Sequence, residues 1–243
     1  MTIEAPADRV IGIHSERGWF SRKTVSRLIG ALFLAGFAVY GTGFGLVTSV
    51  IGAPDFLATV SAFQATLVFG AFLMLLNTVV DVGKGVLFFP ILEHHGKVTA
   101  LAYLAALIVQ VVLLDLGVIC LLMIVPLSEY AVGVGGQSVD WATAAGSLLV
   151  HANTMAYQIG QATLSVGGIF LCLLMFRVRL LPRFLAGWGA IGYAIHLVGA
   201  VGEILGFPIS LVLLIPGGLF EVALALWLII RGFEPQPFVF VRA

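Results

Sequence analysis

Six polar side chains that could do chemistry stand inside long apolar stretches of this sequence. They are three acids, two histidines and one glutamine: Asp115, His151, Gln158, His196, Glu203 and Glu221. Ionisable groups are costly in hydrocarbon and rarely face lipid, so these residues indicate the interior of a helix bundle and a pocket or binding site within it. Acids and histidines of this kind can transfer protons or bind a polar or cationic solute. For any single residue, the alternative is a hydrogen-bonded network that only holds helices together.

Histidine and carboxylate groups are also metal ligands, and His151, His196 and Glu203 are the weak candidates for a metal site. No two of them have the close spacing of an HExxH helix. Haem requires two axial ligands at nearly equal depth, whereas the two histidines are expected to differ in depth by roughly 12 Å. We expect no cofactor, and the sequence does not decide whether a metal is bound.

Composition predicts the elements that hold these residues. The chain has 243 residues, of which 60% are hydrophobic and 10% charged, and its mean hydropathy is +1.12. Such values are typical of a multi-pass integral membrane protein. Six apolar runs approach the roughly 20 residues that cross a bilayer: 25–51, 57–87, 98–125, 148–176, 184–205 and 209–230. The sequence therefore predicts an all-α bundle of six transmembrane helices.

Basic residues are distributed unevenly between the connections. If the connections alternate between two sides, all 12 Lys and Arg fall on one side, and the connections at 52–56, 126–147 and 206–210 contain none. The positive-inside rule then places both termini in the cytoplasm, N-in and C-in, in the cell (cytoplasmic) membrane. We expect tails at 1–24 and 232–243 around one transmembrane domain at 25–231. Few charges per loop favour contact with the lipid bilayer and exclude nucleic acid as a partner.

Depth divides the candidate residues into two layers when it is counted at 1.5 Å per residue from the outer end of each run. Four of them fall near the midplane: Asp115, Gln158, His196 and Glu221. The other two, His151 and Glu203, fall near the outer surface. The sequence therefore predicts an acidic, histidine-containing pocket that opens toward the outer half of the membrane.

Glycines indicate where helices approach one another closely. Gly41 and Gly45 form a GxxxG pair in the first run, and glycines recur every seven residues in the fifth, at positions 192, 199 and 206. In the sixth run, the sequence Pro-Gly-Gly at 216–218 predicts a kink or an unwound turn just outside Glu221, or a bend needed only for packing.

Charged residues near the predicted cytoplasmic side have simpler interpretations. Asp81 and Lys84, with Asn77 one turn earlier, predict an intrahelical ion pair near the cytoplasmic boundary. The acid and two histidines at 93–95 are expected in a solvated cytoplasmic turn.

Three segments of the chain are similar to a known bacterial family: LFFPILEHHGKVTALAYLAALIVQVVLL, RVRLLPRFLAGWGAIGYAIHLVGAVGEILGF and LLIPGGLFEVALALWLIIRGF. From about Arg27 to Phe233 the chain resembles the uncharacterised membrane proteins catalogued as domain of unknown function 4386. The resemblance implies a six-helix fold without an established activity, and recurring acids at the positions of the two glutamates, 203 and 221. The family's third span usually contains an arginine and a glutamate, in a pattern like YLAFRIIE, where this sequence has Leu107 and Gln110.

The function we predict is small-molecule or proton-linked transport or sensing through the intramembrane pocket. The main alternative is a membrane-embedded enzyme that acts on lipid or isoprenoid substrates through Glu203, Glu221 and the two histidines. The third is a structural or accessory membrane subunit. The sequence identifies neither a ligand nor an oligomeric state.

Overall fold

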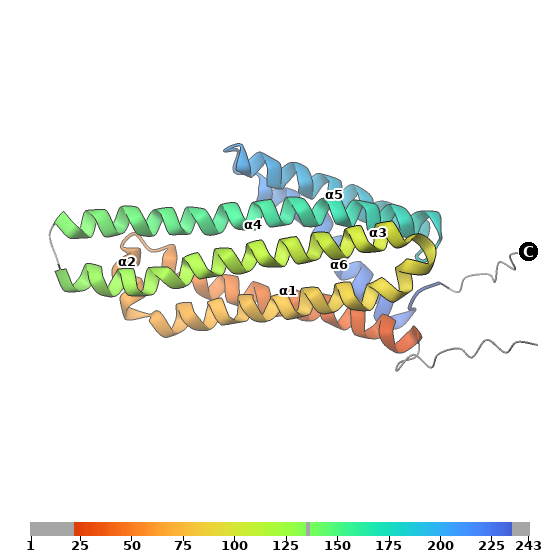
Figure 1. Cartoon of the computed structure of the whole chain (residues 1–243), viewed down its shortest axis with the longest axis horizontal. Coiled ribbons are helices and arrows are strands. Elements are labelled where there is room, and N and C mark those ends of the chain that lie inside the picture. Colours follow the sequence, from red (N-terminus) through yellow and green to blue (C-terminus); the bar gives the residue numbers. More distant parts are fainter. Residues whose placement is uncertain (1–21, 135–136, 235–243) are drawn as a thin grey trace, which may run out of the picture.

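The computed structural model describes residues 22–134 and 137–234, and all regular structure in these ranges is helical. Its six helices lie mostly along one long axis (Figure 1): α1 (Arg22–Ile51), α2 (Phe56–Ala62), α3 (Gln64–Val134), α4 (Gln137–Arg177), α5 (Arg183–Ile204) and α6 (Ser210–Ile230). The predicted all-α fold is confirmed for the described residues. Most of the two predicted tails, residues 1–21 and 235–243, lies outside them.

Five helices are long and apolar enough to cross a membrane, namely α1, α3, α4, α5 and α6. The longest, α3, has 71 residues and bends at Gly96, where φ −177° and ψ 81° depart from helical values. At 1.5 Å per residue, each of its legs, 64–95 and 97–134, exceeds the roughly 30 Å of a hydrocarbon core. By length and composition, these are the helices of a multi-pass membrane protein.

Two predicted connections are largely helical. Within 126–147, α3 continues through Pro126 to Val134 and α4 begins at Gln137. These described segments of α3 and α4 lie side by side as a helical hairpin and extend beyond the end of α5, at the left of Figure 1. This extension is stable as a helix because Ala131 and Ala142 are buried in an apolar cluster shared with α2. Residues 93–95 are likewise helical and lead directly into the bend of α3.

Neighbouring helices form a closed ring. α3 packs against α1 and α4, α4 against α5, α5 against α6, and α6 against α1. At one end of the ring, α1 begins, α3 bends, α4 meets α5 and α6 ends (Figure 1, right). We call this the basic end, because basic residues stand at these helix boundaries: Arg27, Lys97, Arg177, Arg183 and Arg231.

Two buried apolar clusters stabilise the ring. One lies toward the basic end and includes Phe33, Phe88 and Phe220. The other lies toward the opposite end and includes Val47 and Met74, together with residues of α2. Along the first leg of α3, residues 77–84 fall between the two clusters, so this part of the interior is where polar side chains accumulate.

Glycines of α5 permit close contact with α6, as predicted. A Cβ on Gly192 would lie 3.0 Å from the Cα of Gly217, and Gly199 faces the start of α6 equally closely. Gly206 forms the turn between the helices with φ +91°, a conformation that glycine adopts at little cost. Because α6 is helical through Pro216, the predicted unwound turn does not occur. The Pro-Gly-Gly segment therefore lies at a packing contact.

The predicted GxxxG contact in α1 is wrong. A Cβ on Gly41 or Gly45 would meet nothing within 4 Å, whereas Gly43 packs against the backbone of Gly70 on α3. The pattern identified close packing in α1 but assigned it to the wrong face of the helix.

Candidate functional site

Three polar side chains on the first leg of α3 lie together in the interior. Lys84 Nζ is 2.6 Å from Asp81 Oδ1, and Asn77 Nδ2 donates a hydrogen bond to Asp81 Oδ2 at 2.9 Å. Their spacing of three and four residues places them on one helix face. The exposed fractions of all three residues are 8% or less. The predicted ion pair is thus confirmed, but Lys84 is buried inside the bundle and is not part of a cytoplasmic connection.

α1 forms the wall opposite this pair. The ring centroid of Phe33 lies 4.4 Å from Lys84 Nζ, which is a cation–π contact. One turn later, a Cβ on Gly36 would lie 3.1 Å from Asn77 Oδ1 and 4.0 Å from Lys84 Nζ. Within the described structure, Asn77 Oδ1 is buried and accepts no hydrogen bond. α1 therefore packs closely against Asn77 at Gly36, beside an acceptor oxygen that lacks a donor.

Glu221 enters the same interior from α6. The hydroxyl of Tyr193 on α5 donates a hydrogen bond to Glu221 Oε1 at 2.7 Å. Tyr193 is held in place by burial, with its ring against Gly168 of α4. The positive charge of Lys84 attracts both carboxyl groups, Asp81 and Glu221. We call these five residues the charge cluster: Asn77, Asp81, Lys84, Tyr193 and Glu221.

The charge cluster contains two carboxyl groups and one ammonium group. It can therefore hold one more negative charge than positive charge. An unpaired charge is costly in a medium of low dielectric constant, so the cluster is suited to bind one proton or one monovalent cation. Tyrosines from α1, α3 and α4 lie within electrostatic range of its acids: Tyr40, Tyr103 and Tyr157.

A second polar group joins α4, α5 and α6 at the α5–α6 turn. Gln158 Nε2 donates to Ser210 Oγ at 2.9 Å, and the backbone N–H of Ser210 donates to Glu203 Oε2 at 3.2 Å. A carboxylate at the first N–H groups of a helix satisfies an otherwise unpaired donor and stabilises the helix dipole. Glu203 therefore has a structural role as a cap for α6.

This contact corrects the predicted depth layers. Gln158 is not level with Glu221 but lies beside Glu203 at the α5–α6 turn. Along α6, that turn is about 16 Å from Glu221 at 1.5 Å per residue. The error has a structural cause, because α4 begins at Gln137 and extends beyond the end of α5. Depth counted from residue 148 therefore started at the wrong level.

The other three predicted site residues lie on three different helices. His196 is buried on α5 and faces Gly217, Asp115 is half-buried with Oδ1 unpartnered, and His151 is exposed. Among residues 22–134 and 137–234, no group of three His, Cys, Asp or Glu could hold a metal ion. The weak metal candidates, His151, His196 and Glu203, thus provide no three-ligand arrangement there.

Leu107 and Gln110 both lie in the interior of the bundle. Leu107 is part of the apolar cluster at the basic end, and Gln110 is 3% exposed with its Oε1 unpartnered.

Neither Tyr193 nor the central position of the ion pair was predicted from the sequence. A signal for the pair was present, because Asn77, Asp81 and Lys84 stand on one helix face inside an apolar run and not at its end. No comparable signal identified Tyr193, since tyrosine is common in membrane helices.

The model of one protein family, described as Domain of unknown function (DUF4386), matches residues 28–232. Neither a curated protein nor a solved structure matches the chain. The matched range includes the whole charge cluster.

Proposed function

Because the chain belongs to the family described as Domain of unknown function (DUF4386), which assigns no activity, we propose a function from the geometry of the charge cluster. The protein is a proton-linked membrane transporter in which Asp81 and Glu221 bind a proton or a small solute. It lies in the cell membrane and crosses it six times, with both termini in the cytoplasm. Residues 25–231 form its one transmembrane domain.

The six crossings are supported by the shape of α3 and by the positions of basic residues. The bend at Gly96 allows each leg of α3 to cross the membrane once. The basic end would face the cytoplasm by the positive-inside rule. Single cysteines at Lys97 and Ser147, in a chain with Cys120 and Cys172 replaced by alanine, test this orientation. A membrane-impermeant maleimide added outside intact cells should label the Ser147→Cys variant and not the Lys97→Cys variant; the reverse pattern would contradict N-in, C-in topology.

The observation behind the transport proposal is the excess of acid in a buried, hydrogen-bonded cluster. A purely structural network gains nothing from a second buried carboxyl group near an ion pair that is already complete. Glu221 has a precise partner in Tyr193 and an attracting charge in Lys84. This arrangement can accept a charge without exposing the carboxyl group to lipid, as proton-linked transport requires.

A pH step applied to the protein on a solid-supported membrane tests the proposal without a known solute. Proton binding at an intramembrane site moves charge, so we expect a transient current from the wild-type protein. Glu221→Gln and Asp81→Asn should each remove most of that current. Glu129→Gln is the matched control, because Glu129 is an exposed acid whose side chain contacts Gln64. Wild-type currents in both cluster variants would contradict the proposal.

We do not propose the alternative of an enzyme acting on lipid or isoprenoid substrates. That hypothesis relied on Glu203, Glu221 and two histidines acting together. Glu203 caps α6, and His151 is exposed at a different level from Glu221.

A further inference from the structure

Asp115 lies on the second leg of α3, at the border between buried and exposed side chains. On one side of it, Leu114 is buried against Gly160 of α4. On the other side, the exposed fractions of Val112 and Ile119 are 60% and 53%. Asp115 stands three residues after Val112 and four before Ile119, which places all three on one helix face. The half-buried acid therefore belongs in part to the outer surface of the bundle.

This part of the surface lies deep in the apolar length of the helix. Asp115 is about 15 Å from the nearer end of the apolar run 98–125, counted at 1.5 Å per residue. That distance is about half the thickness of a hydrocarbon core, so neither water nor a lipid head group is close enough to pair with the carboxyl group. Its Oδ1 is buried and accepts no hydrogen bond from the described residues. Because an ionisable group in a membrane helix is costly and nearly always paired, we expect the partner of Asp115 outside this chain.

The chemistry of this face selects a positive charge on an apolar helix. Exposed apolar side chains occupy the turns on either side of the acid: Ile108, Val112, Leu116, Ile119 and Met123. Such a strip packs against the apolar side of another membrane helix. The group that pairs most strongly with a carboxylate in its middle is a guanidinium or an ammonium group.

A second copy of the chain would not supply that charge. Among the described residues, Lys84 is the basic residue inside the membrane-spanning helices and away from the basic end. It is 8% exposed and already bound to Asp81. The cation must therefore come from a different protein.

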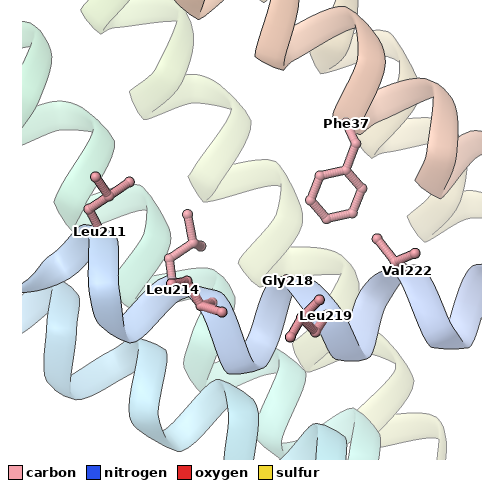
Figure 2. A pocket seen from close by; sticks show the side chains of 7 residues that line it. Phe37, Leu211, Leu214, Gly218, Leu219 and Val222 are labelled. Carbon is pink, nitrogen blue, oxygen red and sulfur yellow. The ribbon is translucent and has the colours of Figure 1, made fainter.

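The groove between α1 and α6 offers no comparable selection. Figure 2 shows it between Phe37 of α1 and residues of α6 such as Gly218 and Leu219, and all the residues that line it are apolar. A surface of that kind accepts any apolar chain. The face of α3 around Asp115 differs because it contains one acid.

We propose that α3 docks a transmembrane helix of a partner protein, and that this helix carries one arginine or lysine near the middle of its apolar span, paired with Asp115. The inference goes beyond the proposed function. It uses the position of α3 in the membrane and none of the acids of the charge cluster.

Two synthetic single-span peptides test the charge. Both are fluorescent leucine–alanine helices of about 20 residues, and the middle residue is arginine in one and leucine in the other. Energy transfer to the full chain in phosphatidylcholine liposomes measures binding, with the acceptor dye on Ser147→Cys and with Cys120 and Cys172 replaced by alanine. We expect saturable binding of the arginine peptide, at least about tenfold tighter than that of the leucine peptide, which is the size of one charge-assisted hydrogen bond. Equal binding of both peptides, or binding of neither, would overturn the inference.

Variants locate the docked helix. Asp115→Asn keeps an acceptor but removes the charge, so it should weaken binding of the arginine peptide about tenfold. Glu129→Gln is the matched control, at an exposed acid of the same helix outside the apolar run, and should not change binding. Val112→Trp should obstruct the face and remove saturable binding, whereas Ile191→Trp, at an equally exposed position of α5, should not. Wild-type binding in Asp115→Asn or in Val112→Trp would contradict the assignment.

Energy transfer between two differently labelled copies of the chain tests the competing occupant. We expect no transfer that depends on Asp115. If Asp115→Asn removed such transfer, and the arginine peptide bound no better than the leucine peptide, the face would be an interface between copies and the inference would be wrong. The inference and the proposed function fail separately, because the peptide assay needs no pH gradient and the pH-step current needs no partner helix.

Discussion

Replacement of Lys84 by methionine should destabilise the protein strongly, although methionine is apolar and similar in length. Lys84 is 8% exposed, and its ammonium group is the only counter-charge given to Asp81 by an ion pair in the described structure. Lys84→Met leaves a buried carboxylate without that partner and removes the contact with Phe33. Removal of one partner of a buried ion pair typically costs about 3–5 kcal/mol of unfolding free energy.

A second substitution shows whether that cost comes from the isolated charge. Asp81→Asn added to Lys84→Met removes the negative charge. The amide oxygen that it introduces can still accept the hydrogen bond from Asn77. A buried pair replaced as a unit costs little, so we expect the double variant to recover more than half of the loss, about 2 kcal/mol or more. The single variant should therefore be less stable than the double variant.

Unfolding in mixed micelles with increasing SDS, followed by circular dichroism, measures these free energies. Lys97→Met is the matched control, because Lys97 is exposed at the bend of α3 and its loss should change stability by no more than about 0.5 kcal/mol. If Lys84→Met were as stable as Lys97→Met, the buried ion pair would contribute nothing to the free energy of unfolding. If the double variant were no more stable than Lys84→Met, the loss would come from packing and the charge argument would be refuted.

Three further predictions concern the helices around the cluster. Tyr193→Phe removes the donor to Glu221 and should cost about 1.5–3 kcal/mol in the same SDS assay, while preserving the helix content seen by circular dichroism; an unchanged midpoint would contradict this hydrogen bond. Gly192→Val forces a side chain against the backbone of α6 and should cost about 1–3 kcal/mol, whereas Gly41→Ala should be neutral or stabilising by up to about 1 kcal/mol; equal effects would refute the assigned helix faces. Glu203→Gln should retain the stability and the pH-step current of the wild-type protein, but Glu203→Ala should lose about 1 kcal/mol of stability with the cap; loss of current in Glu203→Gln would instead assign this acid to the proton site.

The helices were predictable because hydrophobic runs of membrane length leave little choice of structure. Ends marked by basic residues or by glycine, as at Arg183 and Gly206, were placed within a few residues. The end of α3 at Val134 was not predicted from the sequence, because Pro126 and the polar residues after it are typical of a loop. A proline costs one backbone hydrogen bond, and in this hairpin packing against α2 and α4 outweighs that cost.

The candidate site was only partly predictable, because depth depends on how the helices are staggered. Residue spacing alone was enough to pair Asp81 with Lys84, since both lie on one helix. It was not enough to place Gln158 beside Ser210, because their relative level depends on how far α4 extends beyond α6. For the same reason, Glu221 was identified as a buried acid, while its partner Tyr193 on another helix was missed.

The number of charges in the cluster limits what it can bind. With Lys84 bound to Asp81, the remaining acid, Glu221, can be balanced by one proton or by one monovalent cation, but the five residues of the charge cluster include no third acid to balance both. A proton and a monovalent cation would therefore compete for Glu221, since a second positive charge in the same low-dielectric space is costly. Competition of this kind is the physical requirement for exchange, because one ion must leave before the other binds. Lys84 sets this stoichiometry: without its charge, the two acids together would balance two positive charges, and binding of one ion would no longer exclude the other.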